Sequence, residues 1–109
     1  KCFYCGKVMG ETSHADHFIP YDYLFDSPIW NMVGACPTCN LRKSDYLVNR
    51  TFLLALQKRN EDPQFRDIFK HALDRYGKEI TILNNELEQN YNNCALYFDF
   101  LHDFGATAE

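Results

Sequence analysis

The apolar positions divide the chain into a turn-rich first part and a helical remainder. In the stretches 65–76 and 80–101, apolar side chains recur mostly at intervals of three and four residues, the spacing of one helix face. Asp62 and Pro63 form a typical helix start, and Gly77 is a typical stop. We therefore predict a helix that ends at Gly77 and, from residue 78 onward, one long helix or two helices with a break near Asn92.

Short extended runs punctuated by Gly, Pro, Cys and Asn make up residues 1–40. The pattern predicts a strand over 14–21 and a second strand over Met32–Ala35. It also predicts a helix over 41–59, with a break allowed near Ser44. The expected fold class is α+β, with a small strand-containing unit followed by a mostly helical C-terminal region.

Length and composition indicate a folded domain. The chain has 109 residues, of which 46% are hydrophobic and 24% are charged, values typical of one globular domain and not of a disordered segment. No apolar run approaches the roughly 20 residues of a membrane-spanning helix. No signal peptide opens the sequence, so we expect a cytoplasmic protein without a membrane partner.

The net charge of −4 is unevenly distributed. Residues 1–50 contain five Lys or Arg and five Asp or Glu, whereas residues 51–109 contain six and ten. Because nucleic-acid binding relies on Lys and Arg contacts to phosphate, any such function is expected in the first half. The acidic second half is interpreted as solvated helix surface, with contact to a basic partner domain or shielding of a nucleic-acid-binding face as the alternatives.

Four of the five cysteines form two C-x-x-C pairs, Cys2 with Cys5 and Cys36 with Cys39. Two such turns can supply the four thiolates of a tetrahedral zinc site, and four protein ligands make the ion structural. Two redox-active C-x-x-C sites are the alternative interpretation. The fifth cysteine, Cys94, falls in a predicted helix and is expected to be a small buried apolar residue.

Polar residues with catalytic chemistry lie between and just after the cysteine pairs. Asp16 and Asn40 offer hard oxygen ligands for Mg²⁺ or Mn²⁺, and His17 has a pKa suited to general-base catalysis near neutral pH. Arg42 and Lys43 offer positive charge for phosphate. A zinc ion that joins the two pairs would bring these residues into one region, where metal-assisted hydrolysis of a phosphodiester is chemically feasible.

Three motifs occur in order between residues 2 and 45: C-F-Y-C-G, A-D-H-F-I-P-Y and W-N-M-V-G-A-C-P-T-C-N-L-R-K-S-D. Together they resemble the HNH endonuclease family, the His-Me finger or ββα-metal nucleases, in its zinc-knuckle form. The family's fold is a β-hairpin followed by a helix around a catalytic metal ion, and we expect this small ββα unit here.

The resemblance implies a role for each matching residue. His17 corresponds to the general base, and Asn31 to the residue that orients the catalytic loop and the base. Asp16 and Asn40 correspond to the ligands of the catalytic divalent ion. Lys43 corresponds to a recurrent basic position that contacts the phosphate or the leaving group.

The sequence therefore predicts a metal-dependent DNA endonuclease with a structural zinc ion and a catalytic Mg²⁺ or Mn²⁺. DNA is preferred over RNA as the partner, and other domains of a longer parent chain are further expected partners. We assign residues 1–60 to the nuclease unit and residues 61–109 to a helical extension that packs on it. A non-catalytic, zinc-stabilised module that binds nucleic acid or protein is the alternative.

Overall fold

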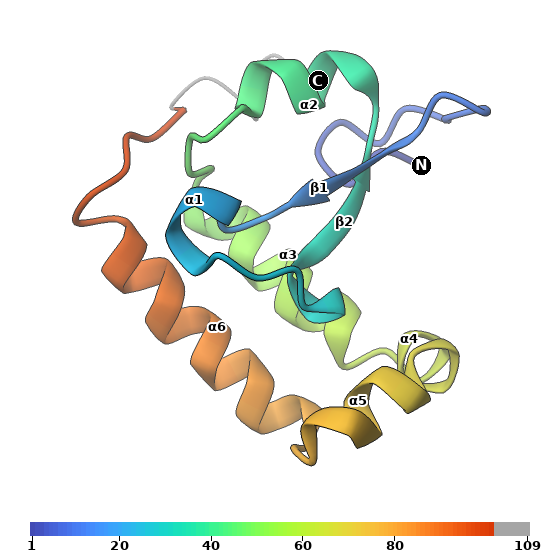
Figure 1. Cartoon of the computed structure of the whole chain (residues 1–109). Helices are drawn as coiled ribbons and strands as arrows, with labels where there is room; N and C mark the ends of the chain where they lie inside the picture. The colour runs from blue at the N-terminus through green and yellow to red at the C-terminus, as the bar shows by residue number, and fades with distance from the viewer. Residues whose placement is uncertain (102–109) are drawn as a thin grey trace.

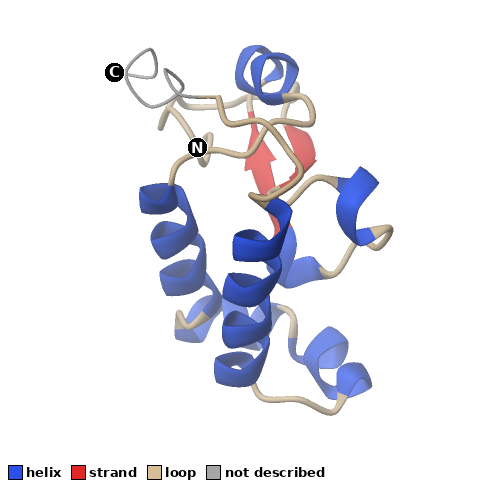
Figure 2. Ribbon diagram, turned by 90° about the vertical axis from the view of Figure 1, so that its left-hand side faces the viewer, coloured by secondary structure: helices blue, strands red, loops and turns tan. Residues whose placement is uncertain are grey.

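The computed structural model describes residues 1–101. Its architecture is mixed α+β, with one two-stranded sheet surrounded by helices (Figure 1), which confirms the predicted fold class. Figure 2 shows how small the sheet is beside the helices. In chain order the elements are β1 (His14–His17), α1 (Tyr21–Leu24), the 3₁₀ helix η1 (Ile29–Asn31), β2 (Met32–Ala35), α2 (Pro37–Lys43), α3 (Arg50–Asn60), α4 (Pro63–Ile68), α5 (Lys70–Tyr76) and α6 (Ile80–Cys94).

The two strands are antiparallel, with Asp16 opposite Val33 and His17 opposite Met32. Strand β2 has the predicted bounds, but β1 ends four residues before the predicted end at residue 21. The chain leaves the sheet because the backbone N–H of Ile19 donates to the side chain of Asn31 instead of to a strand. The predicted strand over 14–21 was therefore too long.

The predicted helix over 41–59 is two helices, α2 and α3. Their separation begins at Ser44, the residue at which a break was allowed, and Ser44 has a φ of 44°. Helix α2 also begins earlier than predicted, at Pro37, because the sulfur of Cys36 accepts a hydrogen bond from the N–H of Cys39 and caps the helix. The second C-x-x-C pair thus lies at the start of α2.

The predicted helix start at Asp62 and Pro63 and the predicted stop at Gly77 are both present, and α6 begins at Ile80, two residues after the predicted restart at residue 78. The Asp62 side chain caps α4 with Pro63 in the first turn, and Gly77 ends α5 in the left-handed conformation. The structure differs in placing Phe69 between α4 and α5. Helix α6 ends at Cys94, close to the break predicted near Asn92, and no second helix follows over residues 95–101. Within residues 1–101, no helix has both the length and the apolar character that crossing a membrane requires.

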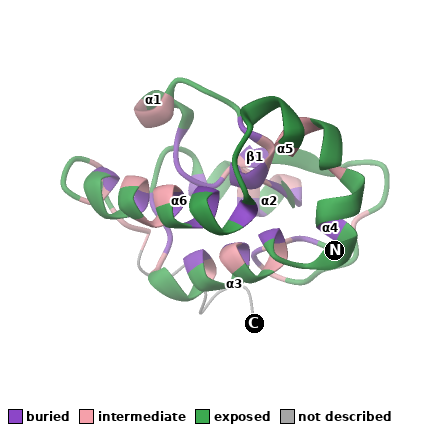
Figure 3. Ribbon diagram, turned by 90° about the horizontal axis from the view of Figure 1, so that it is seen from below, coloured by how far each residue is buried: buried purple, intermediate pink, exposed green. Residues whose placement is uncertain are grey.

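Helices α3 and α6 close the core beneath the sheet. Their buried positions, shown in purple in Figure 3, alternate with exposed ones along each helix. The main core joins residues of the sheet and its flanking loops to residues of both helices: Phe18, Ile19, Val33, Ala35, Leu47, Val48, Leu53, Leu56, Leu87, Tyr91 and Cys94. The helices are therefore part of the same packed core as the strands.

A buried polar network fastens η1 to the helices. The Asn60 side chain, which has no exposed surface, donates to the carbonyl of Trp30 (2.9 Å) and to the side chain of Asn84 (3.0 Å). The Arg59 guanidinium donates to the carbonyl of Met32 at 2.6 Å. Because Trp30 and Met32 flank Asn31, this network fixes the backbone on both sides of that residue.

Candidate active site and zinc centre

The four cysteines of the C-x-x-C pairs converge into one cluster. Their sulfur atoms all lie within 4.8 Å of one another, and the sulfurs of Cys5 and Cys36 are 3.9 Å apart. Tetrahedral zinc with Zn–S bonds of about 2.3 Å requires S···S distances of about 3.8 Å. All five cysteines are free thiols, so disulfide bonds do not compete for these sulfurs. The cluster of Cys2, Cys5, Cys36 and Cys39 is therefore a candidate zinc site with four protein ligands.

The backbone of the first pair is folded as a tight turn. The N–H of Gly6 donates to the carbonyl of Cys2, and Gly6 has a φ of 74°, which glycine adopts without strain. Burial favours the neutral thiol of Cys2, but hydrogen bonds from the backbone at Cys36, Cys5 and Tyr4 outweigh it and lower the pKa of Cys2 to about 7. Cys2 thus favours the thiolate, the form that binds zinc, whereas burial and hydrogen bonds with Cys36, Cys5 and Cys2 raise the pKa of Cys39.

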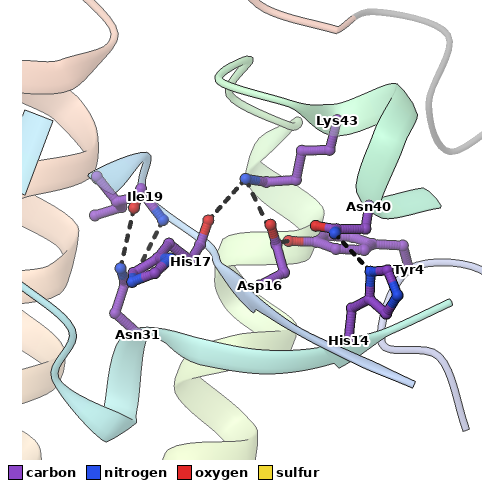
Figure 4. A network of polar contacts seen from close by, with 8 residues as sticks. All are labelled: Tyr4, His14, Asp16, His17, Ile19, Asn31, Asn40 and Lys43. Carbon is purple, nitrogen blue, oxygen red and sulfur yellow. Dashed lines mark hydrogen bonds and ion pairs between the residues drawn. The ribbon is translucent and has the colours of Figure 1, made fainter. Parts of the chain in front are cut away.

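Helix α2 and strand β1 meet through two pairs of side chains (Figure 4). His14 and Asp16 lie two residues apart on β1 and share a face of the strand, whereas Asn40 and Lys43 lie three apart on α2 and share a face of the helix. The Asn40 Nδ2 and His14 Nδ1 atoms are 3.0 Å apart, and the Lys43 Nζ lies 3.5 Å from Asp16 Oδ2. The expected metal ligands Asp16 and Asn40 therefore lie on facing surfaces.

Lys43 lies inside the protein and not on its surface. Its side chain has no exposed area, and its Nζ donates to the backbone carbonyl of His17 at 2.8 Å. Burial lowers the pKa of Lys43, an effect that the charge of Asp16 opposes. The expected contact of Lys43 with a phosphate is therefore not available in this structure, because the ammonium is directed at Asp16 and His17. Arg42, the other expected phosphate-binding residue, is exposed.

The Asp16 carboxylate is also buried, at 6% exposure. Burial raises its pKa, whereas the charge of Lys43 and the hydroxyl of Tyr4, which donates to Oδ2, oppose that rise. Burial, followed by the charge of Asp16, raises the pKa of Tyr4 well above its usual value, so the hydroxyl keeps its proton. Within residues 1–101, the contacts of the Asp16 carboxylate with Tyr4 and Lys43 both fall on Oδ2.

The imidazole of His17 lies apart from this group of residues. Successive side chains on a strand point to opposite faces, so His17 projects away from the face that carries Asp16. Its Nε2 lies 2.7 Å from the hydroxyl of Ser27, and its ring packs against the ring of Tyr21 at a centroid distance of 5.3 Å. The structure thus brings Asp16 and Lys43 together but does not bring the His17 imidazole into contact with either.

Asn31 spans the loop that follows His17. Its Oδ1 accepts from the N–H of Ile19 at 2.9 Å, and its Nδ2 donates to the carbonyl of the same residue at 3.1 Å. Asn31 has no exposed surface. The side chain therefore holds the backbone two residues beyond His17 and is not available to a metal ion.

Three neighbours of the site were not predicted as site residues from the sequence: Tyr4 and Ser27, which no motif indicated, and His14, which was interpreted as a residue without a site role. Tyr4 stands between two cysteines of the candidate zinc site without a spacing signal of its own, and Ser27 reaches His17 through a loop whose path no local pattern predicts. His14 had only its alternation with Asp16 along the strand as a signal.

The donor set fits a divalent ion. The Asp16 carboxylate and the Asn40 amide supply hard oxygen atoms, the ligands that Mg²⁺ and Mn²⁺ prefer. The contact of Asn40 Nδ2 with His14 Nδ1 directs the amide nitrogen toward the imidazole and does not use the amide oxygen. Asp16 and Asn40 are therefore the candidate residues to hold such an ion.

The chain was compared with protein families, with curated proteins and with solved structures. Residues 2–46 match the model of the HNH endonuclease family. Neither the curated proteins nor the solved structures gave a match. The matched segment contains both cysteine pairs, both strands and all of α2, and ends just before α3. The family match confirms, over residues 2–46, the resemblance to the HNH endonucleases that the motifs indicated.

Proposed function

We propose that residues 1–60 form a metal-dependent endonuclease that hydrolyses DNA phosphodiester bonds, with its site residues inside the segment 2–46 that the family model matches. The observation that carries this proposal is the pairing of β1 with α2, which sets Asp16 beside Lys43 and Asn40 beside His14 within the segment of the family match. A module that only binds nucleic acid has no need of an acidic residue and a histidine at the end of one strand.

His17 is the general base in this proposal. The imidazole contacts the hydroxyl of Ser27 through Nε2 and the ring of Tyr21, and both contacts favour its present orientation. With Nε2 engaged by Ser27, Nδ1 is the nitrogen that would take a proton from the attacking water. Asn31 keeps the loop after His17 in place through its two hydrogen bonds with Ile19.

Asp16 and Asn40 hold the catalytic divalent ion, Mg²⁺ or Mn²⁺. When bound, the ion would polarise the scissile phosphodiester and stabilise the leaving 3′-oxygen. Lys43 acts as a positioning residue, because its ammonium holds the Asp16 carboxylate and the His17 carbonyl at the same time. Arg42, exposed one residue earlier on α2, is the residue proposed to contact the DNA backbone.

The zinc ion on the four cysteines is structural in this proposal. The cysteine pairs precede β1 and begin α2, so an ion that joins them fixes the two elements that carry Asp16 and Asn40. We also assign residues 1–60 to the nuclease unit and residues 61–109 to a helical extension that packs on it, of which residues 102–109 lie outside the described part of the chain.

A plasmid-cleavage assay on the zinc-loaded protein, with and without Mg²⁺ or Mn²⁺, tests the proposal. Metal-dependent cleavage that His17→Ala lowers by at least about 10²-fold is the expected result. His71→Ala is the matched control, since His71 is exposed on α5, and this variant should cleave like the wild type. Absence of cleavage by folded, zinc-loaded protein that still binds DNA would instead favour a non-catalytic binding module.

A further inference from the structure

One hydrogen bond joins the cysteine cluster directly to the proposed catalytic metal site. Tyr4 stands between Cys2 and Cys5, and its hydroxyl donates to Oδ2 of Asp16, twelve residues further along the chain. Both side chains are buried, with 5% of Tyr4 and 6% of Asp16 exposed. The contact therefore connects a zinc-binding turn to the carboxylate proposed as a ligand of the second ion.

The ring of Tyr4 is held independently of this hydrogen bond. It packs edge-on against Phe3 and Phe52, at centroid distances of 5.2 Å and 5.5 Å. The residue also lies within a turn that the cysteine sulfurs anchor. Its hydroxyl is thus a fixed donor that orients the carboxylate, and not a side chain that follows Asp16.

The hydroxyl and the Lys43 ammonium both act on Oδ2 of Asp16. Two donors on one carboxylate oxygen fix the plane of the carboxyl group, and neither of these two contacts uses Oδ1. Carboxylate ligands of metal ions are commonly held by such outer hydrogen bonds, and loss of one typically lowers metal affinity about 10–100-fold.

We propose that Tyr4 is a positioning residue that presents the Asp16 carboxylate to the catalytic divalent ion and so couples the zinc-binding turn to the metal site. This inference rests on the proposed function only in taking Asp16 as a ligand of that ion. It assigns to the zinc-binding turn a part in setting the affinity of the second metal.

The test is Tyr4→Phe, which removes the hydroxyl and keeps the ring contacts. Tyr91→Phe is the matched control, because the hydroxyl of Tyr91 is also buried and donates to a backbone carbonyl, that of Val48, away from the site. Zinc content is measured first, and Mn²⁺ binding to the zinc-loaded full chain is then followed by electron paramagnetic resonance. Mn²⁺ prefers oxygen ligands and should not replace zinc on thiolates. Mn²⁺ binding that is lost in Asp16→Asn is binding at the proposed catalytic metal site.

Tyr4→Phe is expected to keep its zinc and to weaken Mn²⁺ binding about 10–100-fold, while Tyr91→Phe binds like the wild type. Equal Mn²⁺ affinities in Tyr4→Phe and the wild type would overturn the inference, as would a wild type that binds no Mn²⁺ through Asp16. Weakened binding without DNA cleavage by any variant would keep the role of Tyr4 and overturn the nuclease.

If Tyr4→Phe folds too poorly for the metal-binding measurement, a second measurement tests the inference through stability. The fall in the unfolding midpoint caused by Tyr4→Phe is compared in the wild type and in an Asp16→Asn background. A smaller fall in the second background is expected, because the amide is a weaker acceptor for the hydroxyl than the carboxylate. Equal falls would show that the hydroxyl does not act on Asp16 and would overturn the inference.

Discussion

The side-chain amide of Asn31 pairs with the backbone of Ile19 as one strand pairs with another, through one donated and one accepted hydrogen bond. Asn31→Asp keeps the shape but loses the donor and places a carboxylate against the Ile19 carbonyl. We expect the free energy of unfolding to fall by about 1–3 kcal/mol, measured by urea denaturation of the zinc-loaded protein.

Asn49→Asp is the control for this substitution. The Asn49 side chain caps α3 by accepting from the N–H of Thr51, and Asp serves equally well at that position. The free energy of unfolding of the Asn49→Asp variant should stay close to that of the wild type. Equal losses in Asn31→Asp and Asn49→Asp would contradict a specific role for the Asn31 donor.

Replacing one partner of the buried Lys43–Asp16 ion pair should lower the free energy of unfolding strongly. Lys43→Met leaves the Asp16 carboxylate buried without its cation, which typically costs about 3–5 kcal/mol of stability. Adding Asp16→Asn should recover part of that loss, because the uncompensated charge disappears. Urea denaturation of the single and double variants measures both effects.

The exposed ion pair of Lys78 with Glu86 serves as the comparison for the buried Lys43–Asp16 pair. The Lys78 ammonium pairs with Glu86 at 2.6 Å, but both side chains are nearly half exposed. Lys78→Met is therefore expected to cost no more than about 1 kcal/mol. If Lys43→Met were as mild as Lys78→Met, the buried pair would not have the structural role described here.

The contact between Ser27 and His17 predicts that removing the Ser27 hydroxyl lowers the rate of DNA cleavage. Ser27→Ala removes the hydroxyl from Nε2 of the imidazole and frees the ring to turn. We expect the cleavage rate at saturating metal to fall about ten-fold, with zinc content and stability unchanged, because the base is less well oriented. Ser13→Ala, at another exposed serine, is the control, and a rate equal to that of the control would refute the orienting role.

Because the buried thiol of Cys94 has a raised pKa, the stability that Cys94 contributes should depend on pH. Burial raises its pKa from 9.0 to about 11, an effect that the charge of Lys43 opposes. Because the pKa is higher in the folded state, the buried thiol contributes fully to stability below pH 9, and this contribution is lost as the pH rises through 11. The stability difference between the wild type and Cys94→Ala should therefore narrow between pH 8 and 11 in urea denaturation. A constant or wider difference would contradict the prediction.

Local signals explain which parts of the fold were predictable. The C-x-x-C spacing, the Asp62–Pro63 start and the stop at Gly77 act over a few residues, and the structure contains the elements they indicate. The end of β1 depends instead on Asn31, twelve residues beyond Ile19. Its extent could not be predicted from the alternation of residues 14–21 alone.

The burial of Lys43 in the candidate site also depends on residues distant in sequence and could not be predicted from local signals. A lysine next to an arginine on a short helix is ordinarily a surface residue. Lys43 is buried because Asp16 and the His17 carbonyl, 26 or more residues earlier, accept its charge and its hydrogen bond. Motif order identified the residue as part of the site, but only the folded arrangement shows which atoms it contacts.

The core shared between the sheet and α3 and α6 limits how this unit can be transferred to another protein. The family match ends at residue 46, yet Phe18 and Ile19, next to the proposed base, pack in one core with Leu53, Leu56 and Leu87. Grafting residues 2–46 alone onto a foreign scaffold would expose that apolar surface to water and release the loop after His17. A transplant that keeps the catalytic geometry has to carry α3 and α6 with it.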